Sequence, residues 1–353
     1  MATREQIDEA LARVIDPELR KPVTELGMVR AVEVDGGRVG VTIALTVAGC
    51  PLRSSFEGQV AEHVGSLPGV ETVELSFDVM SPDERAALTN RLRGGAPERG
   101  IQLQPTTRVL AVASGKGGVG KSSLTVNLAA ALAALGQEVG VLDADIYGHS
   151  IPHMLGVSQK PVVVDKMIVP PVAHGLRLMS IGFFLDDNQP VMWRGPMLHR
   201  ALEQFLQDVH WGEIDTLVVD MPPGTGDVSI SLGQLLPRAE AVVVTTPQPL
   251  AQEVASRAAT MAQKTGMRVV GVVENMTSEI FGSGGGARLA AALGVPLLGT
   301  VPLDPRLRVS GDAGVPLVES DPDAEAAVAI RELARVIDAS RAGGFTRTLP
   351  LVG

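Results

Sequence analysis

Residues 115–123 combine four glycines with a Lys-Ser pair at the spacing G-x-x-x-x-G-K-[ST]. Glycines let the backbone turn tightly and point its N–H groups inward, where they can donate to phosphate oxygens. At this spacing Lys121 would reach the β- and γ-phosphates of a nucleotide, and Ser122 would bind Mg²⁺. A glycine-rich turn that binds nothing is the alternative. The predicted phosphate-contacting residues are Gly115, Gly117, Gly118, Val119, Gly120, Lys121, Ser122 and Ser123.

The elements around this loop favour phosphate binding. Residues 108–113 form a short apolar run suited to a buried parallel strand, and residues 122–135 are rich in alanine and leucine, which favour a helix. A helix that begins at the loop would add a partial positive charge to the site. From residue 106 strands and helices alternate, which predicts an α/β domain with a largely parallel sheet and helices on both faces.

Carboxylates follow two further apolar strands. Residues 216–219 end in Asp220, the arrangement that holds Mg²⁺ through water, and residues 221–227 then read Met-Pro-Pro-Gly-Thr-Gly-Asp. Residues 138–142 end in Asp143 and Asp145. A carboxylate there suits hydrolysis, which needs an oriented water whose proton can be accepted. Two acidic residues that merely cap a strand are the alternative.

Composition limits the classes of partner. The chain has 353 residues, 45% of them hydrophobic, which allows one large and one small domain. Its formal charge of −10 argues against nucleic acid or an anionic membrane as a partner. We find no signal peptide and no run of the ~18 apolar residues that a membrane helix needs. The single cysteine fits a reducing compartment, so we expect a cytoplasmic protein.

The first 90 residues predict a separate α/β module. Thr3 and Gln6 form a possible capping box for a first helix. Two extended runs, 28–34 and 38–47, are joined by Asp-Gly-Gly, and a helical stretch and the strand 71–79 follow. The order is α-β-β-α-β. Residues 91–105 contain three glycines and two prolines and are predicted to be a linker. Residues 106–340 form the second domain, and 341–353 a flexible tail.

The loop and the motifs after it resemble the deviant Walker A ATPases, the superfamily of MinD, ParA and the nitrogenase iron protein. The resemblance implies that Lys116 contacts nucleotide across the interface of an ATP-sandwich homodimer. It also implies that Asp143 lies near Mg²⁺ and that Asp145 positions the attacking water. Lys116, Lys121 and Asp145 are therefore the expected catalytic residues, and Ser122, Asp143 and Asp220 the expected Mg²⁺ residues.

Two segments resemble the Mrp branch of this superfamily, also called ApbC or Ind-type ATPases. One is the Asp-x-Pro-Pro-Gly-Thr-Gly-Asp run that begins at Asp220, and the other is residues 191–197. No role follows from the residue types for Trp193 or Arg194 beyond an interface or structural one. The resemblance implies that Asn275 hydrogen-bonds adenine, with Pro302 and Asp304 on the other side of the base. An amide suits this task because it offers a donor and an acceptor.

The N-terminal module resembles the MIP18-like domain of iron–sulphur assembly proteins, through residues 14–18, 25–29 and 45–52. The resemblance implies a reactive or metal-transfer site at Cys50 and the Asp-Pro-Glu motif. Cys50 precedes a predicted helix, whose dipole would favour a thiolate, but burial is an equally common fate of a free cysteine.

One feature of the family is missing. Many members carry Cys-x-x-Cys just after the Glu-Asn-Met segment, and two chains pool these cysteines around a [4Fe–4S] cluster, whereas residues 275–286 here contain no cysteine. A cluster usually takes four thiolates and a homodimer would supply two, which argues against a stable bridging cluster. His149 and His153 are separated by Pro152 and are not expected to form a metal site.

Two functions remain open. The first is an ATPase that assists iron–sulphur cluster assembly or transfer to client or scaffold proteins. The second is a nucleotide-driven switch or adaptor, in the manner of MinD and ParA, that binds partners and carries no cluster. ATP and Mg²⁺ are the expected cofactors of both.

Overall fold

The computed structural model describes residues 2–47, 52–93, 101, 103–146, 148–184, 195–236 and 238–341. Cys50, Trp193, Arg194 and the predicted tail from residue 342 lie outside these ranges. The chain divides into two compact units. The N-terminal unit comprises Met1–Gln102, Pro161–Val172 and Gln207–Gly212, and the larger unit comprises Leu103–Lys160, Ala173–Leu206 and Glu213–Gly353. The N-terminal unit thus adds two segments from later in the chain to the predicted module.

The N-terminal unit is built on a small sheet of order β1-β2-β3, in which β1 and β2 pair antiparallel and β2 and β3 pair parallel. The five predicted elements occur in the predicted order, and the capping box of Thr3 and Gln6 is confirmed. Two further helices, α2 and α4, were not predicted. The elements are α1 (Arg4–Leu11), α2 (Val23–Leu26), β1 (Val29–Asp35), β2 (Arg38–Leu45), α3 (Arg53–His63), β3 (Thr72–Val79) and α4 (Pro82–Arg93).

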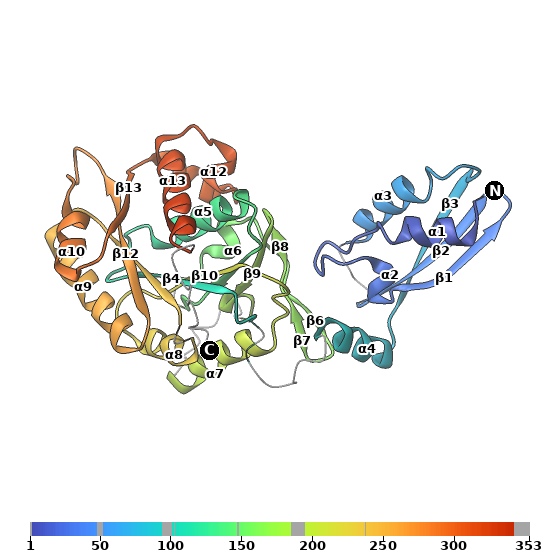
Figure 1. Ribbon diagram of the computed structural model, residues 1–353, viewed down its shortest axis with the longest axis horizontal. Helices are drawn as coiled ribbons and strands as arrows, with labels where there is room; N and C mark the ends of the chain where they lie inside the picture. The colour runs from blue at the N-terminus through green and yellow to red at the C-terminus, as the bar shows by residue number, and fades with distance from the viewer. Residues whose placement is uncertain are drawn as a thin grey trace, which may run out of the picture. The chain divides into compact units, whose positions relative to one another are not determined.

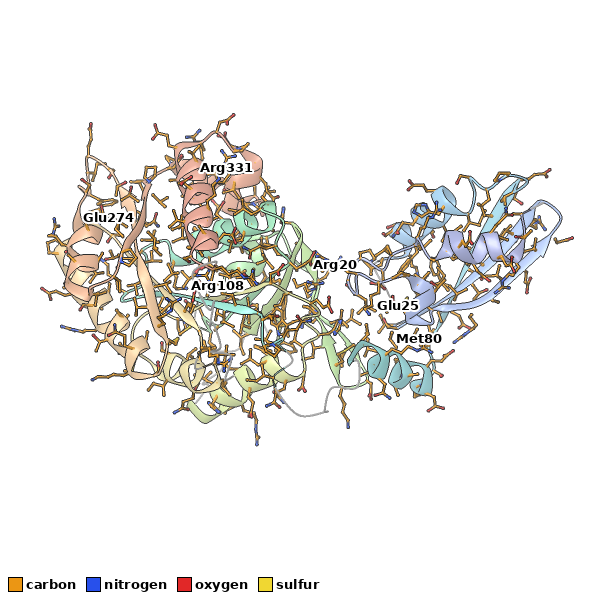
Figure 2. All side chains as sticks on the ribbon, viewed as in Figure 1. Arg20, Glu25, Met80, Arg108, Glu274 and Arg331 are labelled. Carbon is orange, nitrogen blue, oxygen red and sulfur yellow. The ribbon has the colours of Figure 1, made fainter. Side chains whose placement is uncertain are left out.

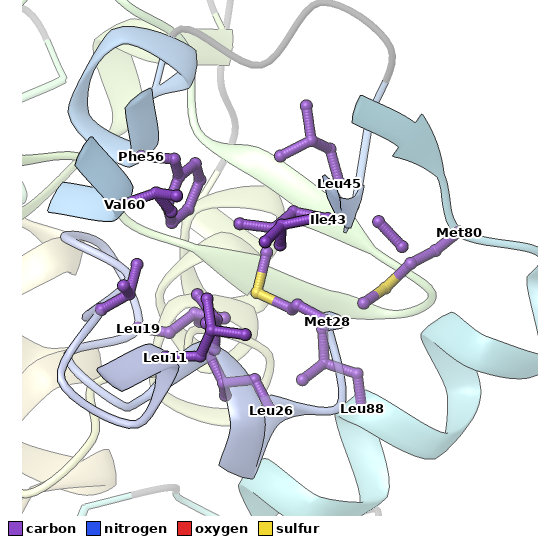
Figure 3. Packing of buried hydrophobic residues seen from close by; sticks show 14 of the residues in the cluster. Leu11, Leu19, Leu26, Met28, Ile43, Leu45, Phe56, Val60, Met80 and Leu88 are labelled. Atoms are coloured by element: carbon purple, nitrogen blue, oxygen red, sulfur yellow. The ribbon is translucent and has the colours of Figure 1, made fainter. Parts of the chain in front are cut away.

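A hairpin from far along the chain completes this unit. It consists of β6 (Val162–Val164) and β7 (Met167–Val169), paired antiparallel. Its buried side chains belong to the same hydrophobic cluster as those of α1, β2 and α3. Figure 3 shows the centre of this cluster, with Met28, Ile43 and Phe56 packed together. The hairpin therefore contributes to the core of the N-terminal unit.

The larger unit is built on a sheet of order β13-β12-β11-β4-β10-β5-β9-β8, and every neighbouring pair from β13 to β9 is parallel. Its strands are β4 (Arg108–Ser114), β5 (Val139–Asp143), β8 (Val172–Ala173), β9 (Leu176–Ser180), β10 (Thr216–Asp220), β11 (Glu240–Thr245), β12 (Arg268–Thr277) and β13 (Leu297–Pro302). Its helices are α5 (Lys121–Ala134), α6 (Ile151–Met154), η1 (Ile181–Phe184), α7 (Gly195–Gln207), α8 (Asp227–Leu235), α9 (Pro249–Lys264), α10 (Gly285–Leu293), α11 (Pro305–Asp312), α12 (Leu317–Ser320) and α13 (Glu325–Ala339).

Helices cover both faces of this sheet, as predicted (Figure 1). Helix α5 packs with α12 and α13, and α9 packs with α8 and α10. Strands β5 and β10 are buried along their whole length, as expected of central parallel strands. At the amino end of β4, Arg108 (Figure 2) donates to Glu240 of β11 and to the backbone carbonyl of Ile337 in α13. Among the described residues, no helix is long and apolar enough to span a membrane.

Candidate functional site

The glycine-rich loop connects β4 to α5, as the sequence predicts. Gly118 and Gly120 have φ angles of 78° and 77°, which L side chains rarely adopt. At Gly115 the constraint is space, because a Cβ there would lie 2.2 Å from the backbone carbonyl carbon of Val254. A Cβ on Gly117 would meet nothing within 4 Å. The loop is therefore packed against α9 at its start and open further along.

The topology places two acidic strand ends beside this loop. Strand β10 lies between β4 and β5, and Asp220 is the register partner of Asp143. Asp220 is fully buried and its Oδ2 accepts from Lys121 Nζ and from Ser122 Oγ, each at 2.7 Å. The lysine and serine predicted to meet phosphate and Mg²⁺ therefore converge on the predicted Mg²⁺ carboxylate.

Asp143 is enclosed by donors. Its Oδ2 accepts from Ser180 Oγ at 3.0 Å and from the backbone N–H of Ile151 at 3.4 Å, and its Oδ1 accepts from the N–H of Asp145 at 3.2 Å. Burial, and then the charge of Asp220, raise the pKa of Asp143 to about 7. The carboxylate therefore holds the start of the following loop and the end of β9, in addition to any contact with a metal.

Asp145 faces the same space. Its Oδ2 lies 3.6 Å from Lys121 Nζ, and its Oδ1 accepts from the N–H of Gly148 at 3.2 Å. Burial raises the pKa of Asp145, while the Lys121 charge opposes that rise. A cavity of about 690 Å³ lies over these groups and is lined by Lys116, the glycine-rich loop, Asp145 and three residues that follow β10, namely Pro222, Pro223 and Gly226.

A second cavity of about 220 Å³ contains the predicted base-binding residues. Asn275, Pro302 and Asp304 line it together with Gly120 and Ser123. Asn275 is buried, and its Nδ2 donates to the carbonyl of Val119 at 2.8 Å. The carboxylate of Asp304 caps α11 and binds Arg306, which lowers its pKa. The structure thus brings the three predicted residues to one pocket beside the loop.

Strand β12 continues past Asn275 into residues 275–286, the segment in which the resemblance led us to look for a cysteine pair. The carboxylate of Glu274 (Figure 2) accepts from the backbone N–H groups of Gly284 and Gly286 and so caps α10. Between Glu274 and Gly284 the backbone makes a tight turn, in which the backbone N–H and C=O groups of Ser278 and Gly282 hydrogen-bond to each other. No group of three or more His, Cys, Asp or Glu side chains that could hold a metal ion occurs among the residues described. His153 lies in α6, whereas His149 precedes this helix.

Sequence reasoning missed two hydroxyls of this site. Thr125 Oγ1 lies one turn along α5 and donates to Asp220 Oδ1 at 2.8 Å. Ser180 comes from β9, which no motif marked. The role of Thr125 could have been predicted from sequence, because it lies four residues after Lys121 and residues four apart share a helix face. The position of Ser180 depends on strand order, which only the structure supplies.

The glycine-rich loop between a central parallel strand and its helix, with the lysine and the Asp220 carboxylate facing each other, defines a P-loop nucleoside triphosphatase. Residues 105–338 match the ParA family model, described as NUBPL iron-transfer P-loop NTPase, and residues 4–75 match that of an iron–sulphur cluster assembly protein. The chain belongs to this iron-transfer family of P-loop NTPases and carries the assembly domain at its N-terminus.

Curated relatives extend over nearly the whole chain. It is 52% identical to the iron–sulphur cluster carrier protein of Mycobacterium leprae over 94% of this chain and 91% of that protein. It is 40% identical to the iron–sulphur cluster carrier protein of Bacillus subtilis, over 86% of this chain and 89% of that protein. Among solved structures it is similar to a nucleotide-binding protein from Archaeoglobus fulgidus in complex with ADP, with a TM-score of 0.54 and 36% identity over 66% of this chain and 93% of that one. A MinD from Pyrococcus horikoshii shares the fold, with a TM-score of 0.53, 23% identity and coverage of 69% and 100%.

Proposed function

We propose that this protein binds and hydrolyses ATP with Mg²⁺ and uses the cycle to carry iron–sulphur clusters to client proteins. The observation that carries the proposal is the convergence of Lys121, Ser122 and Asp220 beneath the glycine-rich loop. We infer that the cargo is an iron–sulphur cluster from the names of the relatives, which are iron–sulphur cluster carrier proteins. The formal charge of −10 and the single cysteine support the further proposal of a cytoplasmic protein without a nucleic-acid or membrane partner.

The residues present fit a nucleotide and its metal. A Cβ on Gly117 or Gly118 would meet nothing within 4 Å, so no other group of the chain crowds these two residues and a phosphate chain can approach the loop. Lys121 would exchange its bond with Asp220 for one with the phosphates, and Ser122 and Asp220 would then hold Mg²⁺. Bound Mg²⁺ would neutralise the charge that develops on the transferred phosphoryl group.

Asp145 is the proposed group that positions the attacking water, because it faces the cavity within 3.6 Å of Lys121. Asp145→Ala should keep ATP binding and abolish turnover, as measured by equilibrium binding and by phosphate release. Asp323→Ala, at an exposed residue of the same unit, is the matched control. Hydrolysis retained in Asp145→Ala would remove this residue from its role.

The nucleotide base is proposed to occupy the second cavity. Asn275 would exchange its bond to Val119 for one with adenine, and the segment of Pro302 and Asp304 would pack against the opposite side. Since the Asp304 carboxylate already binds Arg306, its contact with a base would come through the backbone. Lys116 lines the phosphate cavity, and we propose that in a homodimer it reaches the nucleotide of the partner subunit.

The cysteine content of the chain limits how a cluster could be held. The chain has one cysteine, Cys50, outside the described residues, and lacks the Cys-x-x-Cys that the family resemblance led us to expect. A cluster would therefore be cargo whose ligation is completed by a scaffold or client protein. Anaerobic reconstitution with iron and sulphide should give little stable visible absorbance. A stoichiometric cluster that is lost in Cys50→Ser would show instead that the chain holds it unaided.

The absent cysteine pair also favours a second candidate, a nucleotide-driven switch or adaptor that carries no cluster. Transfer assays distinguish the two. A carrier should accelerate the activation of an apo client from a loaded scaffold, and this acceleration should depend on ATP. A switch should bind its partner in an ATP-dependent manner without any transfer of iron.

A further inference from the structure

The hairpin β6–β7 links the nucleotide unit to the N-terminal unit through the covalent chain. It belongs to the N-terminal unit, although it lies in sequence between α6 and β9 of the larger unit. Val164, Met167 and Val169 are at most 3% exposed and join the core of that unit. Thr89 of α4 also donates to the carbonyl of Val164 at 3.4 Å. Any movement of the hairpin must therefore repack this core.

The docked hairpin closes a small cavity beside the acidic pair of the Asp-Pro-Glu motif. Asp16, Glu18, Val162, Val164 and Val169 are among its lining residues, and its volume is about 10 Å³. That volume is at the lower limit for one water molecule. Burial, and then the charge of Asp16, raise the pKa of Glu18 to about 7. The valines of the hairpin thus help to keep water away from this carboxylate.

The same chain segment is fixed at the nucleotide site at both of its ends. It leaves β5 at Asp143 and returns through β9 to Ser180, whose hydroxyl donates to Asp143 at 3.0 Å. The N–H of Ile151, at the start of α6, is a further donor to Asp143. Only residues 155–160 separate α6 from the hairpin unit.

Helix α6 is also in contact with the wall of the base pocket. At its carboxyl end Gly156 is packed so closely on Gly314 that a Cβ on Gly314 would lie 2.6 Å from Gly156 Cα. Gly314 follows α11, whose residues Leu307 and Gly311 line the base pocket. The segment therefore contacts both the phosphate side and the base side of the proposed nucleotide site before it reaches the hairpin.

We propose that residues 143–180 act as a strap through which the nucleotide state changes the docking of the β6–β7 hairpin and hence access to Asp16 and Glu18. The inference goes beyond the proposed function and rests on it for the nucleotide. Mg²⁺ bound near Asp143 would compete with the bonds that this carboxylate accepts from Ser180 and Ile151. Loops that contact a γ-phosphate and rearrange on its loss are a common switching device.

Hydrogen exchange of the full chain, with and without Mg-ATP, tests the strap. We expect nucleotide-dependent changes in three regions, namely residues 115–123, the hairpin 161–172 and residues 14–28. Unchanged exchange at 115–123 would refute ATP binding itself. A response at 115–123 with none at 161–172 and 14–28 would overturn the strap and leave the proposed function standing.

Substitutions on the two faces of one strand provide a matched pair. Val164 is 1% exposed, whereas Val163 is 53% exposed. Val164→Ala should loosen the hairpin and abolish the nucleotide response at residues 14–28, while ATP still protects 115–123. Val163→Ala should keep all three responses. Equal responses at residues 14–28 in both variants would overturn the proposal.

A second variant tests the link without touching the core, in case Val164→Ala unfolds the N-terminal unit. Insertion of a flexible Gly-Ser segment between Ser158 and Gln159, both largely exposed, lengthens the strap and leaves the hairpin residues intact. The same insertion at Gly36, in the β1–β2 turn, is the control. The strap insertion should remove the nucleotide response at residues 14–28 and the control should keep it. A response that survives the strap insertion would refute coupling through this segment.

Discussion

Replacement of Lys121 by methionine should destabilise the nucleotide-free protein, because it removes the cation from a cluster of buried carboxylates. The side chains of Lys121 and Asp220 are 6% and 0% exposed and their charged atoms are 2.7 Å apart. Asp145 lies 3.6 Å from the same ammonium, and Asp143 is the register partner of Asp220. The variant would leave these carboxylates without that counter-charge.

The size of the effect follows from this burial. Removal of one partner from a buried ion pair costs about 3–5 kcal/mol. Ser122 and Thr125 still donate to Asp220 in the variant, so we expect the lower end, about 3 kcal/mol. For a domain of this size the melting temperature should fall by about 6–12 °C. Lys116→Met removes the same charge from a half-buried residue of the same loop and should change the melting temperature little.

The pH dependence of the loss has a definite sign. Lys121 lowers the pKa of both Asp143 and Asp145, so its removal raises both values further above those of the unfolded chain. A group whose pKa is raised on folding favours the folded state at low pH and loses this contribution as the pH rises through the folded value. The deficit of Lys121→Met should therefore be largest at alkaline pH, and the part that comes from Asp143 should be lost as the pH falls to about 7, the pKa of this group in the wild type.

Thermal unfolding of the full chain, followed by circular dichroism without nucleotide, measures this loss. A double variant, Lys121→Met with Asp220→Asn, should be more stable than the sum of the single effects by about 1–3 kcal/mol, because both charges are gone. Additive effects, or a Lys121→Met protein as stable as Lys116→Met, would refute the reasoning.

Three further predictions concern other parts of the chain. Asn275→Ala should weaken ATP binding about 2- to 10-fold, the value of one hydrogen bond, and reduce selectivity over GTP, as calorimetry would show. Gly115→Ala should abolish ATP binding, because the added Cβ would meet the α9 backbone. Gly117→Ala places its Cβ in open space, so it should keep the fold, as thermal unfolding followed by circular dichroism would show. Glu18→Gln should flatten the pH dependence of stability. In the wild type, burial raises this pKa from 4.5 to about 7, so stability from this group is present below about pH 4.5 and lost as the pH rises through 7.

Much of the nucleotide unit could be predicted from local patterns. Buried parallel strands are continuous apolar runs, and the predicted strand before Asp220 matches β10 closely. The predicted helix 122–135 differs from α5 by one residue at each end. The base-pocket residues Asn275, Pro302 and Asp304 came from family motifs, and the structure brings them to one cavity. Their contacts with a nucleotide remain predictions.

The sequence alone determined the phosphate-binding chemistry, because the spacing of glycines, Lys121 and Ser122 is local and its geometry needs only a strand before it and a helix after it. Tertiary structure alone decided which distant groups meet there. Ser180 reaches Asp143 because β9 pairs with β5, and residues 161–172 join the N-terminal core although the alternation of elements assigned them to the other domain. Short strands such as β6 bury only a few side chains each, so their partner is set by which apolar surface remains uncovered, and local periodicity carries no record of that surface.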